Sequence, residues 1–209
     1  MKSLILLLTL CIGSLSAKAQ ESTYHENGKL ESIGHYDVNE YKTGEWKYYH
    51  ENGQLEAEGR YKEDWKEGVW KHYHNNGRLE ATGNYREDYE IGEWRFYYDN
   101  GQLEEIGNYK KGTKAGEWKY YYKSGQIKTL GKYKENEWKE GEWKSYYENG
   151  QLSSVGRYKE NFKLGKWQYF HENGQLQSAG HHDNEYGLES GAWKYYDVNG
   201  NFIKTEKFK

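Results

Sequence analysis

One motif, Gly-x-Trp-x-x-Tyr/Phe-x-x-x-Gly-x-Leu/Ile/Phe, occurs seven times in this chain. Its tryptophans are Trp46, Trp70, Trp94, Trp118, Trp143, Trp167 and Trp193, and successive copies lie 24 to 26 residues apart. A period of this length corresponds to one supersecondary unit, so the fold is expected to be a stack of similar modules. A stack of modules builds a long surface rather than a pocket, which favours binding over catalysis.

The segment 44–67 illustrates one unit. Residues 45–50 are rich in strand formers, and residues 54–61 form the expected return strand. Asn52-Gly53 between them is a strong hairpin signal, because both central residues of a type I′ turn need positive φ. Residues 62–67 read as a polar connector. With a half unit at residues 24–36, the sequence predicts eight hairpins.

Strand alternation predicts two different faces. A two-residue turn at Asn52-Gly53 would place His50 opposite Leu55 and Trp46 opposite Gly59. One face would then hold Trp46, Tyr48, His50, Leu55, Ala57 and Tyr61, with Gly59 leaving room beneath the indole. The other face would hold Glu45, Lys47, Tyr49, Glu56, Glu58 and Arg60. The aromatic residue at the position of Tyr49 recurs in every unit, so either this charged face carries an aromatic row or a bulge reverses the alternation.

The predicted fold class is all-β, an elongated single-layer antiparallel meander of about eight tandem β-hairpin repeats with period 24. Sixteen strands at a spacing of ~4.8 Å would give a ribbon on the order of 70 Å long. The chain is 30% charged and only 34% apolar, a balance typical of disorder, but its nine Trp and 23 Tyr in register can bury large areas. Without a second layer, we expect these aromatics to be shielded incompletely.

Residues 1–19 differ from the rest of the chain. Lys2 precedes an almost continuous apolar run, and Ala17-Lys18-Ala19 fits a signal-peptide cleavage site, so residues 20–209 form the expected repeat domain. Cys11, the only cysteine, lies inside this leader. We expect a secreted or periplasmic bacterial protein without disulfides and without a transmembrane span. Lipoprotein anchoring at Cys11 is not expected, because Leu10 is bulky where a small residue is required.

The composition argues against several classes of function. The formal net charge is −3, which disfavours nucleic acid as a partner. Motifs for nucleophile elbows, phosphate loops and dinucleotide binding are missing, so we expect no enzyme and no cofactor. His25, His50, His74 and His171 occupy equivalent positions about 10 Å apart, too far to share one metal ion, and we expect no metal site.

Aromatic residues are the candidate binding residues. The row Tyr49, Tyr73, Tyr97, Tyr121, Tyr146, Phe170 and Tyr196 could form a platform for peptides or sugars, or could simply be core. Trp65 and Trp138 lie outside the motif, in the expected polar connectors. Large aromatic side chains on polar loops suggest contact with a partner, although each could also cover the edge of its neighbour.

The segment 44–55, Gly-Glu-Trp-Lys-Tyr-Tyr-His-Glu-Asn-Gly-Gln-Leu, followed by Gly59-Arg60-Tyr61, resembles a MORN repeat. It is most similar to the bacterial variant with Tyr-Tyr-x-Asn-Gly-x-Leu, and the resemblance covers residues 24–208. It implies successive β-hairpins in an elongated sheet and a scaffold role; some bacterial relatives are labelled antitoxins. Choline- and glucan-binding repeats share Gly-x-Trp-x-Tyr, but they have shorter units and a further Trp that this chain lacks.

These observations together predict an exported, non-catalytic scaffold for protein–protein interaction at the bacterial envelope. Two alternatives remain: a carbohydrate or cell-wall binding module that uses the repeated aromatics, and an antitoxin or immunity-like protein. Oligomeric state and the identity of the partner are not encoded in any recognisable motif.

Overall fold

The computed structural model describes residues 20–134 and 137–209; the predicted signal peptide lies outside these residues. Within them the chain forms sixteen strands and no helix. The strands are β1 (Gln20–Tyr24), β2 (Leu30–Tyr36), β3 (Lys42–Tyr49), β4 (Leu55–Lys62), β5 (Trp65–Tyr73), β6 (Leu79–Arg86), β7 (Tyr89–Tyr97), β8 (Leu103–Lys110), β9 (Thr113–Tyr121), β10 (Ile127–Tyr133), β11 (Lys139–Tyr146), β12 (Leu152–Lys159), β13 (Phe162–Phe170), β14 (Leu176–His182), β15 (Glu189–Tyr196) and β16 (Phe202–Phe208).

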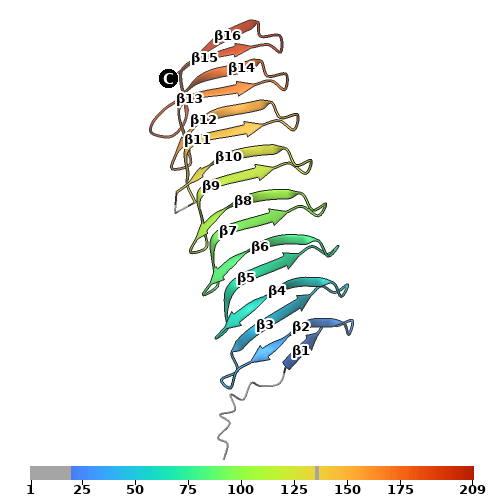
Figure 1. Cartoon of the computed structure of the whole chain (residues 1–209). Helices are drawn as coiled ribbons and strands as arrows, with labels where there is room; N and C mark the ends of the chain where they lie inside the picture. The colour runs from blue at the N-terminus through green and yellow to red at the C-terminus, as the bar shows by residue number, and fades with distance from the viewer. Residues whose placement is uncertain (1–19, 135–136) are drawn as a thin grey trace, which may run out of the picture.

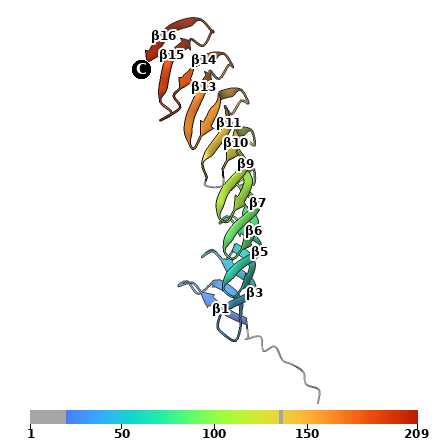
Figure 2. The ribbon, with the colours of Figure 1, turned by 90° about the vertical axis from the view of Figure 1, so that its left-hand side faces the viewer.

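All sixteen strands belong to one sheet in which every strand pairs with its sequence neighbours. Every pairing is antiparallel, so the sheet is an uninterrupted meander of eight hairpins. The result is a long, twisted ribbon whose Asn-Gly turns line one edge and whose connecting turns line the other (Figure 1). Seen from the side, the ribbon is narrow and curved (Figure 2). The predicted fold class and the number of hairpins are confirmed.

The Asn-Gly turns differ from the predicted type I′ geometry. Gly53 has a φ of +89°, but Asn52 does not have positive φ. The Gly53 amide donates to the His50 carbonyl at 2.8 Å, and the His50 amide donates to the Gln54 carbonyl at 2.9 Å. This pattern is a three-residue loop whose glycine occupies the left-handed position of a bulge. The prediction failed because Asn-Gly is compatible with both turns.

A β-bulge follows each of these turns. Tyr48 pairs with Ala57 and Tyr49 pairs with Leu55, so Glu56 is the additional residue. The predicted pairing of His50 with Leu55 is therefore wrong. At the end of the ribbon, Phe202 takes the place of Leu55 and packs against Tyr196, with ring centroids 5.9 Å apart. The bulge thus places the Leu55 position beside the aromatic row, away from the Trp face.

The predicted polar connectors are largely strand. Lys62 pairs with Trp65 across a two-residue turn in which Glu63 and Asp64 have φ of 52° and 68°. Positive φ at both central residues is the type I′ pattern that we expected at Asn-Gly. Two-residue turns with the same φ pattern recur at 87–88, 111–112 and 160–161. The apparent connector therefore continues the sheet between hairpins, and Trp65 is the first residue of β5.

The glycine that begins each motif has a backbone role. Gly68 has a φ of +72°, and a Cβ added there would meet no neighbouring atom within 4 Å. It lies where the pairing of β4 with β5 shifts register, between the pairs Glu58–Lys71 and Arg60–Glu67. Glycine is favoured here because the bulge needs a left-handed residue.

The second glycine of each unit has a steric role. Trp46 pairs with Gly59 in register, as predicted. However, the space above Gly59 is filled by Trp70 of the following unit, because a Cβ on Gly59 would overlap the indole of Trp70. The indole Nε1 of Trp70 also donates to the Arg60 carbonyl at 3.2 Å. Each tryptophan therefore locks its own hairpin onto the preceding one, which corrects the predicted packing within a unit.

The tryptophans are almost completely buried, although the sheet has one layer. Their exposed fractions run from 0% at Trp118 to 4% at Trp143, so the expectation of incomplete shielding is wrong. Edge-on rings separate successive indoles, a tyrosine at each junction except the last, where it is His182. Tyr109, for example, lies 5.1 Å from Trp118 and 6.2 Å from Trp94 between ring centroids. In five units a lysine covers the indole, as Lys114 does at 3.9 Å from Trp118. Neighbouring units thus supply the cover that a second layer would give.

Side chains at the Asn-Gly turns also join successive units. The His50 Nε2 lies 2.8 Å from the Tyr73 carbonyl oxygen, and the Asn52 Nδ2 donates to the Asn75 carbonyl at 2.8 Å. In all seven junctions, the residue equivalent to His50 contacts a backbone carbonyl of the next unit. It is a histidine in four junctions and a tyrosine, which donates its hydroxyl, in three. The Asn position does so in six, and Ser124 occupies it in the seventh.

Candidate interaction surface

The motif tryptophans are committed to the core. Their rings lie between a glycine of the preceding unit and flanking tyrosines, and their Nε1 groups donate to backbone carbonyls in every copy. No ring face remains for a ligand at exposed fractions of 4% or less. Binding by this ribbon must therefore use other side chains.

The inner row, defined as Tyr49, Tyr73, Tyr97, Tyr121, Tyr146, Phe170 and Tyr196, is half-buried in all seven units. It lies on the charged face, since the Tyr73 hydroxyl donates to the Glu58 carboxylate at 2.8 Å and Glu58 lies 3.7 Å from Lys71. Burial and this carboxylate raise the pKa of Tyr73 to about 12. The bulge does not move the row to the Trp face; it brings the residue at the Leu55 position beside it. The inner row is thus partly occupied by its own neighbours.

Trp65 and Trp138 are much more open, with exposed fractions of 52% and 41%. Both lie three residues before the motif glycine of their unit, Gly68 and Gly141. The same position in all units defines the edge row: Tyr41, Trp65, Tyr89, Thr113, Trp138, Phe162 and Leu188. Apart from Thr113, all of these are exposed large apolar or aromatic residues.

Strand alternation places the edge row on the charged face. Lys66 covers the Trp70 ring at 4.6 Å, so Lys66 points to the Trp face and its neighbour Trp65 points to the other. The sequence analysis treated Trp65 and Trp138 as irregular, and it missed the other members of the row. The signal was present, because these positions repeat with the same spacing as the motif tryptophans.

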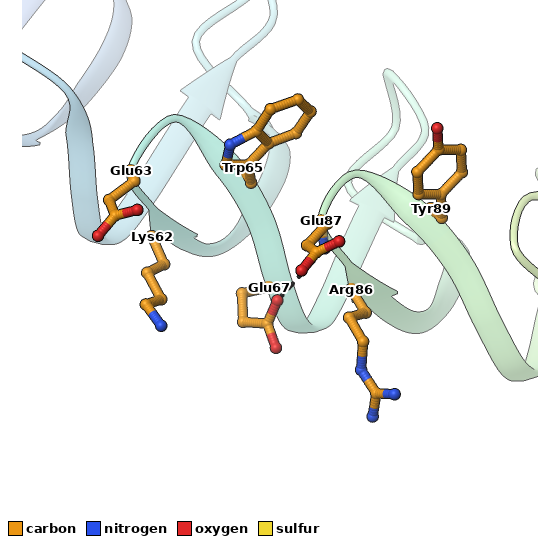
Figure 3. A pocket seen from close by; sticks show the side chains of 7 residues that line it. All are labelled: Lys62, Glu63, Trp65, Glu67, Arg86, Glu87 and Tyr89. Carbon is orange, nitrogen blue, oxygen red and sulfur yellow. Dashed lines mark hydrogen bonds between the residues drawn. The ribbon is translucent and has the colours of Figure 1, made fainter.

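A groove of about 560 Å³ separates Trp65 from Tyr89. Glutamates and two cations line it together with the rings: Lys62, Glu63, Glu67, Arg86 and Glu87. Figure 3 shows the rings of Trp65 and Tyr89 pointing to the same side, while Lys62 and Arg86 extend the other way. The Glu87 amide donates to the Glu67 carboxylate at 3.3 Å. A smaller hollow of about 130 Å³ lies beside Phe162 at the equivalent place near the other end.

The histidines hold the backbone. His25, His50, His74 and His171 each place Nε2 within 3.0 Å of a carbonyl oxygen of the next unit, so this nitrogen acts as a donor. Over residues 20–134 and 137–209, no group of three or more His, Cys, Asp or Glu side chains is arranged to hold a metal ion. In the same residues, no helix is long and apolar enough to cross a bilayer.

Comparisons with known proteins identify a family. No curated protein matches the sequence. The crystal structure of TcdB2-TccC3-Cdc42 aligns at 12% identity and a TM-score of 0.24, over 89% of this chain and 12% of that one. The TCP10 domain of Danio rerio CPAP, solved in complex with a peptide of Danio rerio STIL, aligns at 12% identity and a TM-score of 0.24, over 91% of this chain and 100% of that one. Similarity at this level says nothing about function.

The family model for the MORN repeat variant matches seven times, at residues 19–37, 42–63, 66–87, 90–111, 114–135, 139–160 and 163–184. Each match after the first contains one motif tryptophan and the turn residues that join it to its neighbours. Repeats of this family typically provide non-catalytic surfaces for protein interaction, in agreement with the open ribbon. The matches cover most of the chain, and the protein belongs to the MORN repeat variant family.

Proposed function

We propose that this protein is an exported, non-catalytic scaffold that binds another protein at the bacterial envelope. The observation that carries the proposal is the edge row: six exposed apolar or aromatic side chains that recur at the repeat spacing along one edge of the ribbon. The rings of the two other repeated rows, the motif tryptophans and the inner row, are buried or half-buried. Exposed apolar residues gathered in one place mark interaction sites on proteins. The open sheet offers this edge to a partner along its whole length.

Charge favours a protein partner over a polysaccharide. A neutral sugar gains nothing from net charge, whereas three glutamates against two cations, Lys62 and Arg86, leave the groove between Trp65 and Tyr89 net negative. Carboxylates beside exposed aromatics complement a partner with basic and apolar side chains. Export is supported by the leader-like residues 1–19 and by the absence of cysteine after Cys11.

A site-specific crosslinking experiment tests the proposal in the bacterium that makes the protein. A photoreactive residue in place of Trp65 or Trp138 should yield a crosslinked protein in the envelope fraction. The same residue in place of Val198, an exposed apolar residue at an Asn-Gly turn, serves as the control and should not. Crosslinks to glycan strands, equal crosslinking from all three positions, or a protein retained in the cytoplasm would each refute the proposal.

A further inference from the structure

The turns beside the edge row hold glutamates in an unfavourable backbone conformation. Left-handed φ values, from 51° to 70°, occur at Glu40, Glu63, Glu87, Glu137 and Glu160. Each lies one or two residues before a member of the edge row. Glycine or asparagine fits such positions better, and a longer side chain there costs on the order of 1 kcal/mol. Glu137 also accepts a hydrogen bond from the Lys114 amide at 3.0 Å, and the Glu160 carboxylate lies 4.0 Å from the Lys134 ammonium, whereas Glu63 and Glu87 line the open groove. The ribbon therefore keeps acidic side chains next to its exposed rings at a cost in stability.

Ring and left-handed glutamate are absent together in two units. Thr113 replaces the ring after the turn Lys111-Gly112, which has no carboxylate, and Leu188 replaces it after Gly187, which takes the left-handed position there. If the glutamates served only the turn, they would have no reason to change where the ring changes. The paired loss indicates that ring and acid act on the same partner. The break at Thr113 divides the edge row into two stretches of three members: three rings around Trp65, and two rings with Leu188 around Phe162.

The spacing of the rings limits the conformation of that partner. Members of the edge row lie two strands apart, which is about 9.6 Å. A β-strand presents side chains on one side every ~6.8 Å and cannot match this repeat. A polyproline II helix presents every third residue on one side, ~9.3 Å apart, and matches it over three units.

We propose that the edge row binds a proline-rich, basic polypeptide in the polyproline II conformation. Every third residue stacks on one ring of the row, and lysine or arginine side chains between them face the turn glutamates. Aromatic grooves suit this helix because its conformation is already ordered before binding. The proposal rests on the proposed function, of which it specifies the partner.

Synthetic peptides test this chemistry directly on the purified chain. The probe is four repeats of Pro-Ala-Lys, and the controls are four repeats of Gly-Ala-Lys and of Pro-Ala-Glu. Calorimetry should show that the first peptide binds at least about tenfold more tightly than either control, because only it offers both the ordered helix and positive charge. Equal affinity of the proline and glycine peptides would overturn the proposal.

Variants then locate the site. Trp65→Ser with Tyr89→Ser should weaken binding of the Pro-Ala-Lys peptide by about tenfold, since stacked aromatics dominate such interfaces. Glu63→Gln should reduce both the affinity and its salt dependence, and Val198→Ser should change neither. These side chains are exposed, so circular dichroism should show an unchanged sheet. Unaltered affinity in the double variant would exclude the edge row.

A gain of binding provides a second, independent test. Lys111→Glu with Thr113→Trp restores ring and acid at the break and joins the two stretches. A longer peptide of seven Pro-Ala-Lys repeats should then bind about tenfold more tightly than it binds the natural chain. No gain would contradict the proposal. If position 65 instead crosslinks in cells to a protein through a folded or acidic surface, this inference fails while the scaffold function stands.

Discussion

Substitution of Gly107 by alanine tests how the units are joined. A Cβ at Gly107 would overlap the indole of Trp118 in the following unit. The Trp118 Cγ is only the third-nearest ring atom, and it would still lie 2.5 Å from that Cβ. Carbon atoms in contact are about 3.5–4.0 Å apart, so the ring must move by about 1 Å or more. Tyr109 already packs edge-on against this ring at 5.1 Å. We expect a loss of about 3 kcal/mol in the free energy of unfolding, the upper part of the range for overpacked cores.

A matched control comes from Gly116, two residues before Trp118. Its φ is +70°, and nothing lies within 4 Å of a Cβ built there. Gly116→Ala should therefore cost only the strain of a left-handed alanine, about 1–2 kcal/mol. The comparison separates the steric role of Gly107 from the conformational role of Gly116.

A double-mutant cycle identifies which tryptophan Gly107 accommodates. Gly107 pairs in register with Trp94 of β7 and also with Trp118 of β9, but the ring that a Cβ on Gly107 would overlap is that of Trp118. In the Trp118→Leu background, Gly107→Ala should be nearly neutral, whereas in the Trp94→Leu background it should keep its full cost. Urea unfolding followed by circular dichroism measures all of these variants. Rescue by Trp94→Leu rather than by Trp118→Leu would refute packing between units.

Three further changes have expected outcomes. Trp118→Ala in the middle should cost about 3–5 kcal/mol and split urea unfolding into two transitions, whereas Trp193→Ala should only fray the end; one shared transition would indicate global cooperativity. Asn52→Asp removes a donor to the next unit and should lower the free energy of unfolding by about 1 kcal/mol, and Ser124→Asn should raise it by about the same amount. The urea midpoint should shift accordingly. Burial, and next the charge of Lys66, lowers the pKa of His72 below its ordinary value of 6.5. The unfolded chain therefore binds a proton at a higher pH than the folded chain, and stability should fall as pH drops below 6.5. His72→Phe should weaken this pH dependence between pH 7.5 and 5.5, as measured by the urea midpoint.

The repeat period and the strand former content were sufficient to predict the architecture. Aromatic and β-branched residues at fixed spacing left only a stack of hairpins, and the pairing of Trp46 with Gly59 followed from counting across the turn. Even the number of hairpins could be predicted, because each one carries its own turn. The fold is local, so local sequence information determines most of it.

The errors concern choices that one hairpin cannot decide alone. Asn-Gly suits either a two-residue turn or a loop with a bulge, and the second is found because the Asn52 side chain can then bond to the next unit. Glu63-Asp64 was not recognised as a type I′ turn because glutamate rarely has positive φ. Its partner Asp64 is held by the Lys42 amide of the preceding unit, which donates to its carboxylate at 2.6 Å. In both cases a contact between units selects the local conformation.

The sequence analysis identified only two members of the edge row, Trp65 and Trp138, because contacts between units also decide where the strands begin. Trp65 attracted attention as a large ring among polar residues, but its row could be recognised only after the connector was known to be strand. The inner row was named from the sequence as a candidate binding platform, and the structure shows that its members contact neighbouring units, as the Tyr73–Glu58 hydrogen bond illustrates. Periodicity alone does not distinguish a ring that packs from a ring that binds. Exposure does, at 52% for Trp65 against 1% for Trp70 five residues later.

The ends of the ribbon show what the junction between units requires. Inside the sheet, every junction places an indole on a glycine of the preceding hairpin. In the first strand, Glu21 pairs with Gly34 at the position that Trp46 occupies opposite Gly59 in the next hairpin. In the last strand, Glu206 pairs with Trp193 at the position that is glycine elsewhere. The two free edges therefore offer neither a ring nor a space for one, and both carry a carboxylate, which is how natural sheets prevent their edges from pairing further.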